Sequence, residues 1–396
     1  MNRSIAIGGG TNAPGGTNAP GGTSSWDGTN APGGTSSSGG ELGTGGNPTR
    51  VALSVSVGSA EACSLRSDGT VSCWNFSTNL VASVVPGITS ARMLSVGWSR
   101  DYNPLPACAV LADGSVQCWD SSSWAPSLTA ERTAPTTIVG IQGAISVSVG
   151  GDHACALLKD TSVQCWGSNE SGQLGIGKLR SELLYSQKPL PVAGLSNVAR
   201  LSAGYNTVCA ALYDGTVQCW GYLTLGGHYD VYATPCDVGL KGVVDVSAGL
   251  ERVCVVFGDG AMNCWGDLTY GNGYGLDYGP TWPTTATLAP NEIATQSVST
   301  GYMHDCALRV DHTITCWGQA YQGQLGLGQY ESSPGFYSDN PGPGTVVGID
   351  DAIAVSAGNG DSCAVRSDGT VWCWGAKSGD SHNYNSAVPL KVPSAD

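Results

Sequence analysis

The sequence predicts an all-β protein: a seven-bladed β-propeller preceded by a disordered tail rich in Gly, Thr and Pro. The 396 residues include 58 Gly and 20 Pro but only 12% charged residues, which indicates many tight turns and few amphipathic helices. One unit recurs seven times from residue 51 onward, at spacings of 45 to 57 residues. Periods near 50 residues are typical of propellers.

Each unit contains two cysteines ten positions apart, and a tryptophan follows the second one. The cysteine pairs are Cys63 and Cys73, Cys108 and Cys118, Cys155 and Cys165, Cys209 and Cys219, Cys254 and Cys264, Cys306 and Cys316, and Cys363 and Cys373. The tryptophans are Trp74, Trp119, Trp166, Trp220, Trp265, Trp317 and Trp374.

The residues between the two cysteines predict a β-hairpin. In the first unit Asp68-Gly69 separates two apolar runs, which is a hairpin turn signal. A three-residue loop places Cys63 opposite Cys73. Two units have Thr161 and His312 where the others have the turn glycine, so their turns are expected to be strained or differently shaped.

Side chains alternate along these hairpins, and both faces of the resulting sheet are apolar. In the third unit one face carries Cys155, Leu157, Val163 and Cys165, and the other carries Ala156, Leu158 and Trp166. A sheet that is apolar on both faces must be covered on both. Propeller blades, which stack face to face, meet this requirement.

Further strands flank each hairpin. The preceding strand ends in Gly, as in Val-Ser-Ala-Gly, and the second unit carries six extra residues within 98–106. An outer strand is expected around Pro189–Val192. The similar C-terminal run Val388–Val392 has no hairpin after it, so it is expected to complete the sheet of the first blade and close the ring.

The unit resembles the RCC1 (regulator of chromosome condensation) repeat, in the Cys-rich form of bacterial members. The resemblance rests on Cys155–Gly167 followed by Gly172-Gln173-Leu174-Gly175, and on the copy that ends in Gly323-Gln324-Leu325-Gly326. It covers residues 51–392 and implies the propeller fold. Relatives include a nucleotide exchange factor, a ubiquitin-ligase accessory domain and a secreted β-lactamase inhibitor, so the family implies no single function.

The chain is expected to divide into a disordered low-complexity tether, residues 1–48, and the propeller, residues 49–396. The first segment repeats Gly-Gly-Thr-Asn-Ala-Pro and contains almost nothing apolar, so burial cannot offset its ordering entropy. Such tethers link anchors to folded heads at bacterial cell surfaces. The first residues do not form a signal peptide, so the protein is either cytoplasmic or its export signal lies upstream.

The spacing of the fourteen repeat cysteines permits seven hairpin disulfides, because opposed residues in an antiparallel pair are within disulfide reach. Buried thiols are the alternative. Because both cysteines recur in all seven units, we expect disulfides, hence an oxidising, extracellular or cell-surface location. Cys236 is left over; we expect it in a loop between blades four and five, as an unpaired spectator.

Several function classes are disfavoured. The net charge is −14 and the 17 Lys and Arg form no run of three, so no nucleic-acid partner is expected. No stretch has the length of a transmembrane helix. No catalytic, metal or cofactor motif occurs, so we expect neither enzyme activity nor a cofactor. His153 and His304 share one repeat position and are interpreted as hydrogen-bonded scaffold residues.

The connections between blades are rich in Tyr and Trp, which bury much area at binding surfaces with little entropy loss. The candidate binding residues are Trp98, Tyr102, Trp124, Tyr270, Tyr274, Tyr278, Trp282, Tyr321 and Tyr330. The alternative is that these rings pack over blade edges.

The preferred hypothesis is a monomeric, non-enzymatic exported or cell-surface module that binds a protein or a glycan through one propeller face. The resemblance leaves open an intracellular regulator of a small GTPase that promotes nucleotide exchange. An enzyme that uses the central channel is a third alternative.

Overall fold

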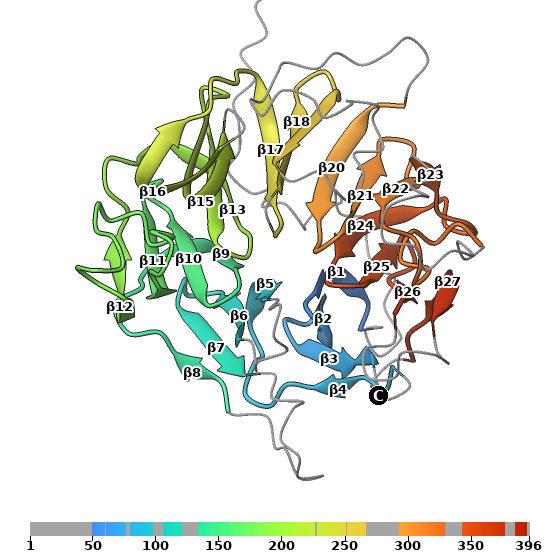
Figure 1. The fold of residues 1–396 in the computed structure, drawn as a ribbon. Helices are drawn as coiled ribbons and strands as arrows, with labels where there is room; N and C mark the ends of the chain where they lie inside the picture. The colour runs from blue at the N-terminus through green and yellow to red at the C-terminus, as the bar shows by residue number, and fades with distance from the viewer. Residues whose placement is uncertain are drawn as a thin grey trace, which may run out of the picture.

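The computed structural model describes residues 50–59, 61–76, 80–97, 106–120, 134–225, 228–250, 252–266, 293–328, 343–376 and 385–393. They form seven antiparallel sheets around a central axis, which confirms the seven-bladed β-propeller (Figure 1). Residues 1–49 lie outside the described part, so the division into a tether and a propeller stays a prediction.

The blades follow one another along the chain, each built from one continuous segment. The strands of blades one to four are β1 (Ala52–Val57), β2 (Glu61–Arg66), β3 (Val71–Asn75), β4 (Ser83–Val84); β5 (Ala91–Val96), β6 (Pro106–Leu111), β7 (Val116–Asp120), β8 (Thr136–Thr137); β9 (Ala144–Val149), β10 (His153–Leu158), β11 (Val163–Ser168), β12 (Tyr185–Pro191); β13 (Val198–Ala203), β14 (Thr207–Leu212), β15 (Val217–Leu225) and β16 (His228–Asp237). Those of blades five to seven are β17 (Val243–Ala248), β18 (Arg252–Phe257), β19 (Met262–Gly266); β20 (Thr295–Thr300), β21 (His304–Arg309), β22 (Ile314–Gly318), β23 (Gly344–Thr345); β24 (Ala352–Ala357), β25 (Asp361–Arg366), β26 (Val371–Gly375) and β27 (Ser386–Lys391).

Each hairpin between the second and third strands has the predicted register. Cys63 lies opposite Cys73, and the equivalent residues are opposed in every blade. Thr161 and His312, each with a φ of 67°, adopt the left-handed conformation of the turn glycines. These two turns therefore keep the common shape and are strained, because a left-handed backbone is unfavourable for residues with a Cβ.

The hydrophobic core lies between the blades. Seven clusters of buried residues each combine side chains of two neighbouring blades. In blade four, Cys209 and Cys219 pack against blade five, while Trp220 packs against blade three. Both faces of the sheet are thus buried, as the alternation predicts.

The innermost strands are joined by a ring of serine side chains. In each one, a serine two residues before the terminal glycine accepts a hydrogen bond from a backbone N–H of the next innermost strand, at donor–acceptor distances of 2.8–3.0 Å. The serines are Ser56, Ser95, Ser148, Ser202, Ser247, Ser299 and Ser356. This polar pairing satisfies N–H groups that the first strand cannot pair within its own sheet.

The C-terminal strand does not close the ring, and that prediction was wrong. β27 pairs with β26 in blade seven, and blade one has an outer strand of its own, β4. The seam between blades seven and one closes like the other six. Val57 N donates to Ser356 Oγ at 3.0 Å, and Val55 and Val57 share an apolar cluster with blade seven. Contacts between the blades therefore close the ring, without a C-terminal strand that completes the sheet of blade one.

Candidate binding face

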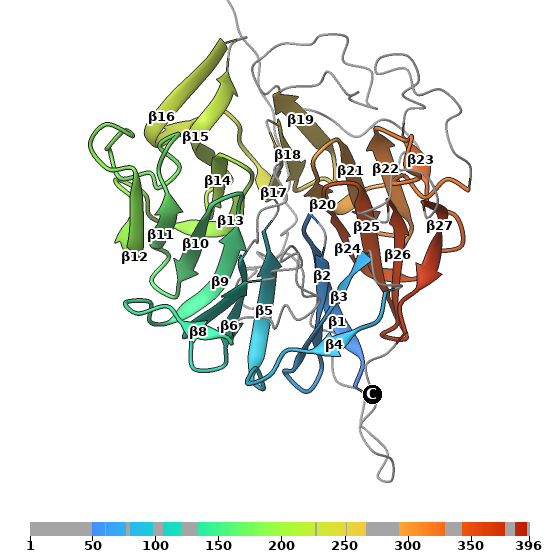
Figure 2. The same ribbon diagram turned by 60° about the horizontal axis from the view of Figure 1, so that its bottom comes forward.

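The direction of the strands sorts the connections onto two faces of the ring. Because the four strands of a blade are antiparallel, the first-to-second and third-to-fourth connections leave on one side. We call this side the loop face. The Asp-containing hairpins between second and third strands lie on the other side, the hairpin face. In Figure 2 the arrowheads of β19 and β22 point to the loop face.

A ring of glycines holds the blades together at the loop face. Each follows an innermost strand, and the ring comprises Gly58, Gly97, Gly150, Gly204, Gly249, Gly301 and Gly358. A Cβ on Gly58 would overlap the carbonyl oxygen of Gly97, and a Cβ on Gly358 would overlap that of Gly58. Only glycine permits this approach of one backbone to the next. The rim around the axis is therefore a tightly packed support.

The two Gly-Gln-Leu-Gly segments fix third-to-fourth connections onto the following blade. The carbonyl of Gln173 accepts from the indole N–H of Trp220 at 2.9 Å, and the carbonyl of Gln324 accepts from that of Trp374 at 2.9 Å. The side chain of Gln324 turns back to accept from Gln322 N at 2.8 Å. These loops are thus preorganised by the neighbouring blade, which lowers the entropy cost of binding.

One of the nine predicted binding residues lies in the described part of the chain. Tyr321 is in the connection between β22 and β23, on the loop face, and is 46% exposed. The other eight lie outside the described residues: Trp98, Tyr102, Trp124, Tyr270, Tyr274, Tyr278, Trp282 and Tyr330. Their role in binding stays a prediction.

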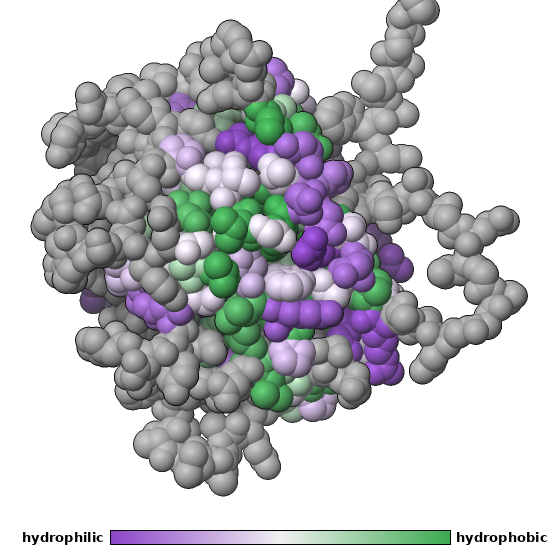
Figure 3. Space-filling model, turned by 90° about the vertical axis from the view of Figure 1, so that its right-hand side faces the viewer, coloured by the Kyte–Doolittle hydropathy of each residue, from purple (hydrophilic) through white to green (hydrophobic). Residues whose placement is uncertain are grey.

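Exposed apolar side chains that sequence reasoning missed lie on the same face. Leu179, Leu184 and Tyr185 belong to the connection between β11 and β12 or to the first residue of β12, and they are 45%, 48% and 55% exposed. The connection is fixed to β16 by a hydrogen bond from Gly177 N to Ala233 O at 2.8 Å. No sequence signal separates them from buried leucines. On the outer side of blades six and seven, by contrast, hydrophobic residues are interspersed with hydrophilic ones (Figure 3).

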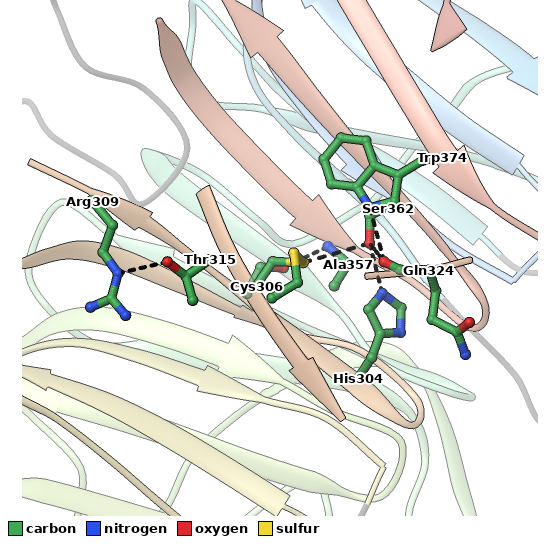
Figure 4. Close-up of a disulfide and its surroundings, with 10 residues drawn as sticks. His304, Cys306, Arg309, Thr315, Gln324, Ala357, Ser362 and Trp374 are labelled. Atoms are coloured by element: carbon green, nitrogen blue, oxygen red, sulfur yellow. Dashed lines mark hydrogen bonds between the residues drawn. A yellow bond between two sulfur atoms is a disulfide. The ribbon is translucent and has the colours of Figure 1, made fainter. Parts of the chain in front are cut away.

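A band of buried polar residues underlies the loop face, at the first two positions of several second strands. His304 is fully buried, and its Nε2 lies 2.7 Å from Ser362 Oγ, which in turn donates to Gln324 O (Figure 4). Burial, together with nearby Arg252, lowers the pKa of His304 to about 3. This histidine is a hydrogen-bonded scaffold residue, as predicted. Substrate cannot reach it in the folded protein.

The other members of this band are also buried in the seams. Arg252 and Asp305 form an ion pair between blades five and six, with Nε and Oδ1 3.3 Å apart. Burial raises the pKa of Asp305 to about 6, against the effect of Arg252. His153 differs from His304, because neither of its ring nitrogens has a hydrogen-bond partner among the described residues. The prediction that His153 is hydrogen-bonded is therefore wrong.

We expect His153 to make the protein less stable in weak acid. Burial lowers its pKa from 6.5 to about 4, so between these values the unfolded chain binds a proton that the folded chain does not. Stability is therefore lost as the pH falls, by about 2 kcal/mol from pH 7 to pH 5 for this residue. The variant His153→Thr removes this contribution, and it introduces the residue type that blade four carries at the same position, Thr207.

Denaturant unfolding of the two proteins at pH 5, 6 and 7 measures the effect, because other titrating groups cancel in the difference. The variant should gain about 2 kcal/mol relative to wild type between pH 7 and pH 5. A stability difference that stays constant over this range would show that His153 titrates alike in the folded and unfolded chain.

All fourteen repeat cysteines are joined in seven hairpin disulfides, as predicted. Seven disulfides favour an oxidising environment. In the described part of the chain, Glu61 with Cys63 and Cys73 is the one group of three potential metal ligands, within 4.8 Å. Its two sulfurs are bonded to each other and offer no thiolate. Within the same residues, no helix is long and apolar enough to cross a membrane.

Cys236 is a free cysteine, but it does not lie in a loop between blades. It belongs to β16, the outer strand of blade four, directly opposite Cys219. The predicted location was wrong: the strand continues through Pro235, a residue type that is disfavoured within a sheet. An outer strand tolerates such residues, since only one of its edges is paired.

Comparisons with known proteins agree with this architecture. Models of the regulator of chromosome condensation (RCC1) repeat match residues 144–173, 352–383 and 162–211. No curated protein matches the chain in sequence.

Several solved structures share the fold. Prp20p from Saccharomyces cerevisiae is 18% identical with a TM-score of 0.61, over 78% of this chain and 80% of that one. Human WBSCR16 is 19% identical with a TM-score of 0.61, over 79% and 86%. The ectodomain of the Physcomitrella patens receptor kinase CR4 is 20% identical with a TM-score of 0.51, over 83% and 74%. The chain thus carries repeats that match the RCC1 family models, within a seven-bladed propeller.

Proposed function

We propose that this protein is a non-enzymatic recognition module, exported or held at the cell surface, that binds a protein or a glycan through the loop face. The observation that carries the proposal is that preorganised connections of this face, in blades three and six, present exposed apolar and aromatic side chains. Tyr185, Leu184 and Leu179 lie there with Tyr321, each on a connection fixed to the next blade.

The neighbours in structure support a binding role. Prp20p is described with binding properties to Gsp1p and histones, and a further structure shows it bound to Kap60. The CR4 propeller is part of a receptor ectodomain. These neighbours support only the general point that this fold presents binding surfaces. The seven disulfides favour the extracellular alternative over an intracellular GTPase regulator, which would work in a reducing compartment.

The described residues also support a non-enzymatic role. The pairing of His304 with Ser362 resembles part of a catalytic dyad, but both side chains are buried in a seam. The Nδ1 atom of His304 has no partner among the described residues, so no carboxylate orients the ring as a catalytic base requires. The raised pKa values of Asp305 and Asp245 arise from the same kind of burial.

Matched tyrosine substitutions test the loop face. Tyr185 and Tyr321 lie on this face, whereas Tyr213, 51% exposed, lies at a hairpin turn on the opposite face. Glycan arrays and affinity capture from the native extracellular fraction identify the ligand, and titration then compares the variants. We expect Tyr185→Ala with Tyr321→Ala to weaken binding by about tenfold or more, as for aromatic hot spots, and Tyr213→Ala to leave it unchanged.

The reverse pattern would place the binding site on the hairpin face and overturn the proposal. Accelerated nucleotide release from a small GTPase, across a panel of such enzymes, would favour the intracellular regulator instead.

A further inference from the structure

Blade four contains three cysteines in one row across three strands. Cys209 of β14 lies opposite Cys219 of β15, and Cys219 lies opposite Cys236 of β16. Cys209 and Cys219 form the disulfide of this blade, and Cys236 carries the free thiol. Directly opposed residues of neighbouring strands place their side chains on the same face of a sheet. The thiol is therefore on the face that carries the disulfide.

The packing agrees with this arrangement. Cys209 and Cys219 are fully buried in the apolar cluster between blades four and five, and Cys236 packs against the same cluster. The Sγ of Cys236 donates a hydrogen bond to the carbonyl oxygen of Cys219 at 3.2 Å. The thiol is thus held beside the residue whose sulfur it would attack.

We propose that Cys236, Cys219 and Cys209 form an internal thiol–disulfide exchange relay. The thiolate of Cys236 attacks Sγ of Cys219, and the bond between these two sulfurs forms. The bond between Cys219 and Cys209 breaks, and its electron pair goes to Sγ of Cys209, which takes up the proton that Cys236 lost. One disulfide and one thiol are present before and after, so the step needs no oxidant or reductant.

The row also supplies the direction of attack. A thiolate displaces a sulfur by approaching along the line of the disulfide, from the side away from the leaving group. Cys236 and Cys209 are on strands that flank β15 on opposite sides, so Cys236 approaches Cys219 from the side opposite Cys209. Exchange would move the covalent link from the β14–β15 pair to the β15–β16 pair. The outer strand would then be fixed and the inner hairpin released.

Blade four differs from the other blades in this respect. Where an outer strand is described elsewhere, the residue opposite the second cysteine is Ser83, Thr136, Leu190, Gly344 or Leu390. Among the described outer strands, only β16 supplies a thiol at that position. Burial, with a contribution from Asp237, raises the pKa of the Cys236 thiol to about 11, so the thiol form dominates near neutral pH and exchange is slow there.

Single-cysteine variants test the relay in the oxidised full chain. Cys209→Ser leaves Cys219 beside Cys236, and refolding with oxidised glutathione should join them, so that N-ethylmaleimide labels no thiol. The matched variant Cys363→Ser leaves Cys373 opposite Leu390, so it should be labelled at two positions, Cys373 and Cys236. Circular dichroism establishes that both variants fold. Two labelled thiols in folded Cys209→Ser would overturn the proposal.

Wild type provides a measurement that needs no variant. The protein is held at pH 8 without oxygen or reductant, quenched with acid, unfolded, labelled under acidic conditions and digested without reduction. We expect one label per chain, divided between Cys236 and Cys209, together with a peptide that joins Cys219 to Cys236. The Cys236→Ser variant should carry no label. A label confined to Cys236 at every time point would show that no exchange occurs.

Discussion

Reduction of the seven disulfides is expected to unfold the propeller. Each disulfide closes a hairpin loop with a sequence separation of ten residues, which is worth roughly 2–3 kcal/mol in the chain-entropy model. Seven such links together exceed the net stability of about 5–15 kcal/mol that is common for folded proteins. Loss of near-ultraviolet circular dichroism on adding reductant at 25 °C, reversed on reoxidation, is the expected result.

One blade provides the graded control. Cys363→Ala with Cys373→Ala removes a single disulfide and leaves six, so the free energy of unfolding should fall by roughly 2–3 kcal/mol without loss of the fold. If the fully reduced protein melts within a few degrees of the oxidised one, seam packing alone holds the ring. The disulfides would then be dispensable, and the inference of an oxidising location would lose its main physical support.

The features that sequence reasoning predicted are local ones. The register of Cys63 against Cys73 follows from a turn three residues long, and the alternation of Cys155 and Trp166 follows from the two-residue period of a strand. Both depend only on residues within one hairpin. Repetition in seven units then made the blade count secure.

The features that it missed join residues far apart in the chain. Ser356 and Val57 are 299 positions apart, and nothing in either local sequence indicates that they form a hydrogen bond. A repeated Ser two residues before each terminal glycine was visible, but its partner was not. The sequence therefore predicts that the C-terminal strand closes the ring, whereas in the structure the serine side chains join blade seven to blade one.

The candidate site could be predicted only in part, because it too depends on contacts between residues that are far apart in the chain. Composition points to aromatic connections, and Tyr321 is exposed on the loop face. The exposure of Leu179 and Leu184 depends on how one loop lies on the next blade, which no local pattern reports. Cys236 was predicted in a loop, but it lies in β16, and the edge position of this strand accommodates the adjacent Pro235.

Replacing one glycine of the ring should open the seam between blades seven and one. In Gly358→Ala the new Cβ would overlap the carbonyl oxygen of Gly58 and press on the side chain of Val57. Both neighbours belong to the next blade, and one is backbone, so neither can yield without separating the two blades. We expect a loss of about 3 kcal/mol in the free energy of unfolding, measured by denaturant titration of the oxidised protein.

The matched control is Gly258→Ala, where a Cβ would make an ordinary contact of 3.7 Å with Val244 and where blade two carries Ala112 at the equivalent position. This change should alter stability by less than about 0.5 kcal/mol. Equal effects of the two substitutions would mean that glycine acts only through the unfolded chain. A large difference would show that backbone contact between blades, rather than a shared strand, closes this propeller, because Gly358 and Gly58 belong to its last and first blades.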